Sequence, residues 1–255
     1  MTRMLLAALI AGSLSLPSCY QFQVTAQGGY TQMAIGGDMA LAPTGGSIGT
    51  TVNQDFESAL GLGDDQGSPW ARVQIDTGVP VLTASGFMFS EDGQGHLNAS
   101  FGGISGGTDV FSELDFTNAK ISYAFQIEVG PVSVSPGLAV DVFDLQMHVQ
   151  DVAGFASEDV DVLAPVPMAF LRLEADLGLI GLLLEGGYIK TPTIQDAKGT
   201  FWDVEAMLEV RPTSVLHLFA GYRVLNLEGE GEVDDQAFDA QIDISGWVIG
   251  GGVRF

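Results

Sequence analysis

The chain has 255 residues, 46% of them hydrophobic, and its 32 acidic against 9 basic residues give a formal charge of -23. So few basic side chains leave no electrostatic footprint for DNA or RNA, whose binding depends on neutralising phosphates, and nucleic acid is therefore excluded as a partner. A single cysteine excludes an internal disulfide framework and a cysteine-rich zinc site. The apolar content is too high for a disordered chain, and the length suits one large β domain or two small ones.

Residues 1–18 have the pattern of an export signal. Arg3 provides a short basic start, an apolar stretch follows, and Pro17 ends it. The stretch is too short to cross a membrane as a helix. We therefore expect an exported chain whose residues 19–255 form a single domain.

Two processing sites are open at the end of this signal. Cys19 follows a sequence that resembles a bacterial lipobox, which would leave this cysteine as a lipidated N-terminus. The alternative is ordinary cleavage after Ala26.

Past residue 20, apolar and polar residues alternate with a period of two, which is typical of β-strands that have two chemically different faces. Every second residue from Ile121 to Val129 is apolar, whereas Lys120, Gln126 and Glu128 fall on the other face. The same alternation predicts ten strands, at 21–35, 68–76, 80–90, 113–129, 132–149, 164–176, 179–190, 200–211, 214–228 and 237–255.

The connections between these strands alternate strictly in length. Short reversals occur at 77–80, 130–131, 177–179 and 212–214, and longer connections rich in Gly and Asp occur at 36–67, 90–113, 150–164, 191–199 and 229–236. This layout is typical of a transmembrane antiparallel up-and-down β-barrel with short periplasmic turns and longer, here acidic, outer loops. We expect about ten strands, with eight as the alternative because the first and third are the weakest.

One predicted strand, 132–149, departs from the pattern. Its apolar residues change parity between Val142 and Phe143, which predicts a β-bulge. Pro136 removes a ladder hydrogen bond in the same strand.

The polar face of the predicted strands carries charges of both signs. Burying them between the two sheets of a soluble sandwich would cost several kcal/mol for each unpaired charge, whereas a polar barrel lumen accommodates them at lower cost. We therefore predict a lumen ion network of Arg72, Lys120, Arg172, Glu174, Asp203, Glu205, Glu209, Arg211 and Arg223.

The apolar face ends in aromatic residues that suit the two membrane interfaces. Trp247 and Phe255 lie eight residues apart on one face, roughly 26 Å along a strand and about 20 Å in height after tilting, close to the separation of two aromatic girdles. We expect a lipid-facing girdle of Tyr123, Trp202, Tyr222, Trp247 and Phe255.

The export signal, the alternating connections, the run Phe101-Gly102-Gly103 and the ending from Trp247 to Phe255 together resemble the small Gram-negative outer-membrane β-barrels. The likeness is to OmpA- and OmpW-like barrels in general and to an uncharacterised group named for a Gly-Gly feature in particular. The resemblance implies an outer-membrane location, membrane lipid as a partner, and recognition of the final strand by the barrel insertion machinery. It implies no established activity, and Cys19 departs from it because integral barrels are not usually lipoproteins.

Candidate chemistry is sparse. His148 follows Asp144 and precedes Asp151, and a histidine with carboxylates near an outer rim resembles the outer-membrane proteases called omptins, although their paired acidic motifs are not recognisable. His217 is expected to pack in the lumen and His96 to be solvated in a loop. We predict no enzyme activity, no cofactor and no metal site, and we keep a rim-located hydrolase and a lipid-tethered extracellular β protein as alternatives.

The lumen charges allow two readings. In a narrow barrel they would form a plug of ion pairs, and the alternative is a cation-preferring pathway set by the acidic excess. Phe170 and Phe219 on the inner face favour the plug. The predicted role is therefore structural, surface-interacting or minor small-solute transport, with the ligand unknown.

Overall fold

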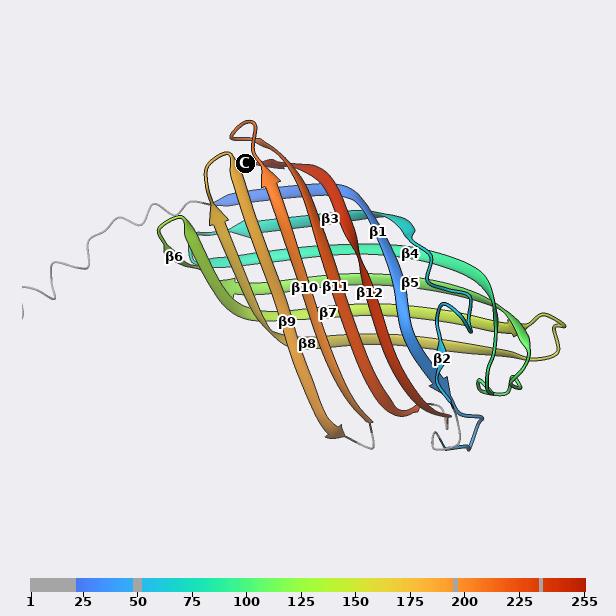
Figure 1. Cartoon of the computed structure of the whole chain (residues 1–255). Coiled ribbons are helices and arrows are strands. Elements are labelled where there is room, and N and C mark those ends of the chain that lie inside the picture. The colour runs from blue at the N-terminus through green and yellow to red at the C-terminus, as the bar shows by residue number, and fades with distance from the viewer. Residues whose placement is uncertain (1–21, 48–51, 195–196, 234–235) are drawn as a thin grey trace, which may run out of the picture.

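The computed structural model describes residues 22–47, 52–194, 197–233 and 236–255, which form an all-β structure (Figure 1). No helix in this part of the chain is long and apolar enough to cross a membrane. The strands are β1 (Gln23–Leu41), β2 (Gln54–Asp55), β3 (Gln66–Asp76), β4 (Pro80–His96), β5 (Asp109–Phe125), β6 (Ile127–Val129), β7 (Val132–Asp151), β8 (Ser157–Asp176), β9 (Ile180–Ile194), β10 (Ala197–Val210), β11 (Leu216–Val233) and β12 (Gln236–Arg254).

Ten of these strands form a closed antiparallel ring. Each pairs with its neighbour in the order β1, β3, β4, β5, β7, β8, β9, β10, β11 and β12, and β12 returns to pair with β1. The closing pairs run from Thr25 with Arg254 to Leu41 with Phe238. The short strands β2 and β6 pair with β1 and β7. The prediction of a ten-stranded up-and-down barrel is confirmed, and the eight-stranded alternative was wrong.

The short turns and both ends of the described chain gather at one end of the barrel, the periplasmic end by the rule for such barrels. Val24 and Phe255 exchange backbone hydrogen bonds there. The turns after β3 and β8 share an Asp-x-Gly pattern in which the carboxylates of Asp76 and Asp176 accept the N–H of Gly78 and Gly178. Both glycines have positive φ, which a side chain would strain.

The strands extend farther at the outer end than the sequence predicted. The ends of the predicted loops at 36–67, 90–113 and 150–164 are strand in the structure, where they belong to β1, β4, β5, β7 and β8. In this region Val110 and Leu114 still face inward while Glu113 and Asp115 face outward, so the period of two continues. The outward residues become polar where the wall rises above the lipid, and this drop in hydropathy had suggested loops.

The predicted bulge in β7 is absent, and that prediction was wrong. β7 keeps one register with β5 and one with β8 throughout. Val140 faces outward, whereas Asp141, Phe143 and Leu145 lie on one inward row. The parity change arose because the interior turns apolar at Phe143. Pro136 falls in the interruption that separates β5 from β6.

The predicted export signal at 1–18 and the lipidation candidate Cys19 lie outside the described residues. The alternative cleavage position after Ala26 lies within β1, where Ala26 pairs with Val253 of β12 and Val73 of β3.

Candidate functional site

The outward face of the ring is apolar, as a lipid-facing wall requires. Tyr123, Tyr222, Trp247 and Phe255 of the predicted girdle are 41% to 74% exposed, and Trp202 is partly exposed on the same face. Large aliphatic side chains are exposed between them, among them Leu138, Leu171, Leu182, Leu208, Leu218 and Ile249. No second layer of described residues covers these rows. The outward face is therefore a hydrophobic belt and not a sandwich core.

Two tyrosines of the belt were missed. Tyr30 and Tyr188 are about half exposed on the outward face, and the ring of Tyr30 lies 6.2 Å from that of Trp247. Their positions in the alternation of β1 and β9 would have placed both on the outward face. The Gly-rich stretch of β1 had obscured this alternation around Tyr30.

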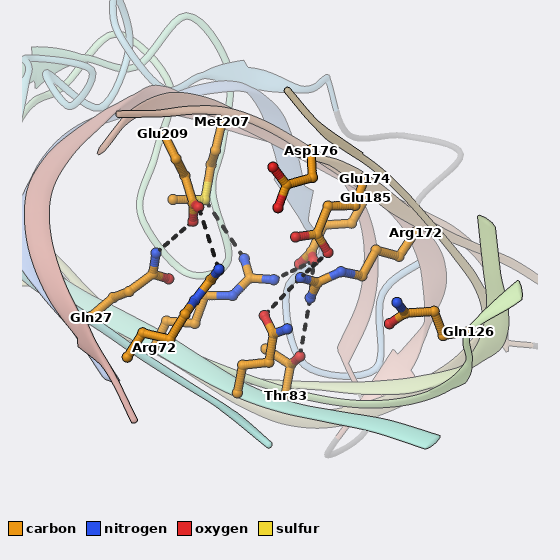
Figure 2. Close-up of polar contacts among 12 residues, drawn as sticks. Gln27, Arg72, Thr83, Gln126, Arg172, Glu174, Asp176, Glu185, Met207 and Glu209 are labelled. Atoms are coloured by element: carbon orange, nitrogen blue, oxygen red, sulfur yellow. Dashed lines mark hydrogen bonds and ion pairs between the residues drawn. The ribbon is translucent and has the colours of Figure 1, made fainter. Parts of the chain in front are cut away.

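Inside the ring, charged side chains from opposite walls meet. Arg72 on β3 reaches Glu185 on β9 at 2.5 Å and Glu205 on β10 at 3.4 Å. β3 and β9 lie five strands apart in either direction around the ring, so this pair spans the lumen. Figure 2 shows Arg72 and Arg172 pointing into the lumen toward Glu185, and Arg172 lies 3.8 Å from the same carboxylate.

Two further cations complete this layer. Lys120 on β5 contacts Asp203 at 2.7 Å and Glu185 at 2.9 Å. Arg223 on β11 contacts Asp203 at 3.0 Å and Asp141 at 3.5 Å, and its guanidinium lies 5.3 Å from the ring centre of Phe87.

We call this layer the ionic floor; it consists of Arg72, Lys120, Asp141, Arg172, Glu185, Asp203, Glu205 and Arg223, each at most 4% exposed. Four cations face four carboxylates, so the floor is charge-balanced even though the chain is strongly acidic. Asp203 and Glu185 each bridge at least two cations, which suits a packed plug of ion pairs.

A second ionic group lies toward the periplasmic mouth and is more exposed. Arg172 pairs with Glu174 at 3.1 Å, and Arg211 pairs with Glu209 at 3.0 Å and with Asp176 at 2.5 Å. All nine predicted network residues thus lie on the inner face, in the ionic floor or in this group. The alternation had placed Glu185 and Asp141 on the polar face, but it could not identify Glu185 as the centre of the floor because contacts across a lumen leave no pattern in the sequence.

The interior changes character directly above the ionic floor, where Phe116, Phe143 and Phe201 form an aromatic row. The rings of Phe116 and Phe143 lie 6.5 Å apart, and those of Phe143 and Phe201 lie 5.2 Å apart. A cavity of about 520 Å³ stands on this row in the outer half of the barrel. We call it the outer chamber; its other apolar lining includes Met39, Leu145, Leu225, Leu227, Ile242 and Ile244.

The three histidines lie apart from one another. His148 faces outward on β7, and its Nδ1 lies 2.6 Å from the carboxylate of Asp159 on β8, a partner not foreseen from the sequence. His217 is buried in the lumen beside Gln27, with 3.0 Å between the two Nε2 atoms. His96 ends β4 and pairs with Asp109 at 2.7 Å. In the described ranges, no group of three or more His, Cys, Asp or Glu residues is arranged to hold a metal ion.

Comparison with solved structures places this architecture among outer-membrane β-barrels. The outer-membrane protease OmpT from Escherichia coli matches with a TM-score of 0.58 and 8% identity, over 95% of this chain and 99% of that chain. The NalP translocator domain from Neisseria meningitidis matches with a TM-score of 0.41 and 16% identity, over 99% of this chain and 95% of that chain. Ail from Yersinia pestis matches with a TM-score of 0.37 and 10% identity, over 92% of this chain and 99% of that chain. No family model matches, and neither does any curated protein.

At these identities the likeness concerns the fold alone. The chain has an outer-membrane β-barrel fold, and the hydrophobic belt around it fits the outer membrane as its location.

Proposed function

We propose that this chain is an integral outer-membrane protein whose lumen is closed to ions and hydrophilic solutes, and that it serves a structural or surface-interaction role without catalysis. The observation that carries the proposal is the contact of Arg72 on β3 with Glu185 on β9, which bridges opposite walls. Side chains fill barrels of this strand number, whereas water-filled channels belong to much larger ones.

The balance of charge in the ionic floor supports the plug over a cation pathway. A cation pathway needs an excess of carboxylates that face water. The carboxylates of Asp141, Glu185, Asp203 and Glu205 are buried and lie next to arginine or lysine. The acidic excess of the chain lies elsewhere, including outer positions such as Asp64, Asp65 and Asp92.

The test of closure is conductance in planar bilayers. We expect the folded wild-type chain to give no discrete current steps. The matched comparison is a charge-neutral variant that truncates two cations and two carboxylates of the floor, Lys120→Ala, Arg223→Ala, Glu185→Ala and Asp203→Ala, which should conduct if it inserts. Regular steps from the wild type would overturn the proposal.

The second proposal concerns catalysis, which we infer to be absent. His148 pairs with Asp159 on the outward wall, and no hydrogen bond or ion pair joins it to Asp144 or Asp151, with which it was first grouped, among the described residues. We expect no hydrolysis of peptide or phospholipid substrates. His96→Ala provides a matched control for His148→Ala because both histidines make an exposed pair with one aspartate. Turnover lost only in His148→Ala would establish the omptin-like alternative.

Integral insertion separates this proposal from a lipid-tethered protein. The exposed hydrophobic belt should make the chain resist a carbonate wash and migrate faster on gels when unheated. Release by the wash would favour the tethered alternative. Membership of the Gly-Gly group and recognition of the strand ending at Phe255 by the insertion machinery remain part of this proposal.

A further inference from the structure

The wall of the barrel is incomplete between β8 and β9. β8 pairs with β9 only from Ala169 with Tyr188 to Asp176 with Gly181. Beyond Ala169, the outer half of β8 pairs on its other side with β7 as far as Ser157, and among the described residues the outer end of β9 pairs only with β10. The two strands diverge toward the outer end (Figure 1). We call the opening between them the β8–β9 gap.

Two prolines explain why pairing stops. In an antiparallel ladder, successive residues direct their N–H and C=O groups to alternate neighbours. Asp176 donates to Pro131 beside β7 and Leu177 donates to Ile180 of β9, so odd-numbered residues of β8 face β9. The register with β7 is constant, and this parity therefore holds at Pro165 and Pro167. Both positions lack the N–H that β9 would need.

The outer chamber lies at this gap. Its wall includes Val160, Val162 and Ala164 from the outer half of β8, and Thr191 and Phe201 from β9 and β10 on the other side of the gap. Its volume of about 520 Å³ is within the range of roughly 300–1,000 Å³ typical of small-molecule sites. The gap therefore adjoins the chamber and offers a lateral route into it.

The chemistry of the lining selects the occupant. Phe116, Phe143 and Phe201 offer ring faces at the base of the chamber, where the ionic floor closes the path downward. Four charged residues border the chamber from the outward side of their strands: Asp159, which pairs with His148 at 2.6 Å, Lys198, which pairs with Glu230 at 2.8 Å, and Asp161 and Glu228. This rim is thus net negative and would repel a carboxylate, phosphate or sulfonate.

We propose that the outer chamber binds one uncharged, ring-containing apolar molecule, which exchanges through the β8–β9 gap. The proposal deepens the proposed function by naming the ligand class of a surface-interacting barrel, and it rests on that function only for the closed floor beneath the site. Conductance tests the floor and dye binding tests the chamber, so the two can fail separately.

The test uses two fluorescent probes that differ by one charge. N-phenylnaphthylamine is uncharged, and anilinonaphthalene sulfonate adds a sulfonate to the same pair of ring systems. With the folded chain in lipid nanodiscs and empty nanodiscs as background, we expect saturable binding of about one N-phenylnaphthylamine per chain and at least about tenfold weaker binding of the sulfonate, a difference of about 1.4 kcal/mol.

Neighbouring substitutions provide the control. Ala164 lines the chamber, whereas Leu163 is exposed on the outward face. Ala164→Phe should weaken N-phenylnaphthylamine binding at least about tenfold by filling the cavity, and Leu163→Phe should leave it within about twofold. Equal effects of the two substitutions, or no saturable signal from the wild type, would overturn the chamber assignment.

Two further variants test the β8–β9 gap as the route of exchange and the charged rim as the source of selectivity. Pro165→Val with Pro167→Val restores two N–H donors toward β9 and should slow probe uptake and release while the amount bound at saturation stays the same. Asp161→Asn with Glu228→Gln should strengthen binding of the sulfonate probe without a comparable gain for the uncharged one. Unchanged exchange rates would refute the lateral route, and an unchanged preference would refute selection by the rim.

Discussion

The ionic floor and the outer chamber are built on the same strands, and they differ by a single step along the inner row. Asp141 gives way to Phe143 on β7, Asp203 to Phe201 on β10, and Arg223 to Leu225 on β11, each two residues farther out. The alternation along a β-strand determines which residues face inward, but it does not determine whether those residues are polar or apolar. The interior of this barrel is therefore layered, ionic below and apolar above.

The two layers depend on different interactions. A buried charge is tolerated only with its partners, so each member of the floor depends on side chains from several strands. The chamber depends on apolar contact, and an apolar cavity can stand empty at a modest loss of packing. Substitutions should therefore cost more stability in the floor than around the chamber.

The largest effect is expected from Asp203→Ala. The substitution leaves Lys120 and Arg223 without their shortest ion pairs and should lower the free energy of unfolding by about 3–5 kcal/mol. The measurement is urea unfolding of the barrel folded in lipid vesicles. Glu113→Gln, which removes an exposed charge on the outward face of β5, is the control and should change stability little. Equal losses would mean that the floor does not depend on its buried pairs.

A smaller loss is expected from Phe143→Ala, at the base of the chamber. Removing the ring takes away contacts with Phe116 and Phe201 and should cost about 3 kcal/mol, at the low end for a buried phenylalanine because the site already borders a cavity. This variant should give no current steps in planar bilayers because the ionic floor is intact. Phe155→Ala, at a side chain that is 90% exposed, is the control for the same truncation. Current through Phe143→Ala would show that the aromatic row, and not the floor, closes the lumen.

The sequence predicted the ring and its two faces because both follow from local alternation. Lys120, Asp203 and Arg223 were placed in the lumen by parity alone. The contacts of Glu185 with Arg72 and Lys120 could not be predicted, since they depend on which strands stand opposite one another in the closed ring.

The outer chamber was missed for a different reason. The predicted inner face was polar apart from residues such as Phe170 and Phe219, so the inward apolar residues of β7 from Phe143 onward suggested a bulge. The β8–β9 gap was encoded by Pro165 and Pro167, but the direction of their missing donors became clear only from the register of β8 with β7.

A second interruption, between β3 and β4, shows how a gap can be covered. Pairing there ends at Trp70 with Phe87, one residue before Pro69, and the connection between β1 and β3 lies against the outer part of β4. Glu91 of β4 accepts the N–H groups of Gly63 and Asp64 from this connection. Its apolar residues Phe56, Leu60 and Leu62 are buried. The β8–β9 gap has no such cover among the described residues.

The smallest effect is expected from weakening this cover with Asp55→Ala. The Asp55 carboxylate accepts the N–H of Ser58 at 2.7 Å and its hydroxyl at 2.8 Å, and these hydrogen bonds hold the pKa of Asp55 below its ordinary value. Losing this cap should cost about 0.5–1 kcal/mol and expose the connection to amide exchange near Gly63, without unfolding the ring. Asp65→Ala, at an exposed position of the same connection, is the control and should leave exchange unchanged.

The acid dependence of this cap has a defined sign. Because the pKa of Asp55 is lower in the folded chain than in the unfolded one, its stabilisation is complete above the ordinary carboxyl pKa and is lost as the pH falls through the lowered folded value. Exchange near Gly63 should therefore differ between wild type and Asp55→Ala at neutral pH and converge in strongly acidic buffer. A difference that persists in acid would assign the effect to packing of the connection and not to the carboxylate, and the β3–β4 cover would then depend on Phe56 and Leu60 alone.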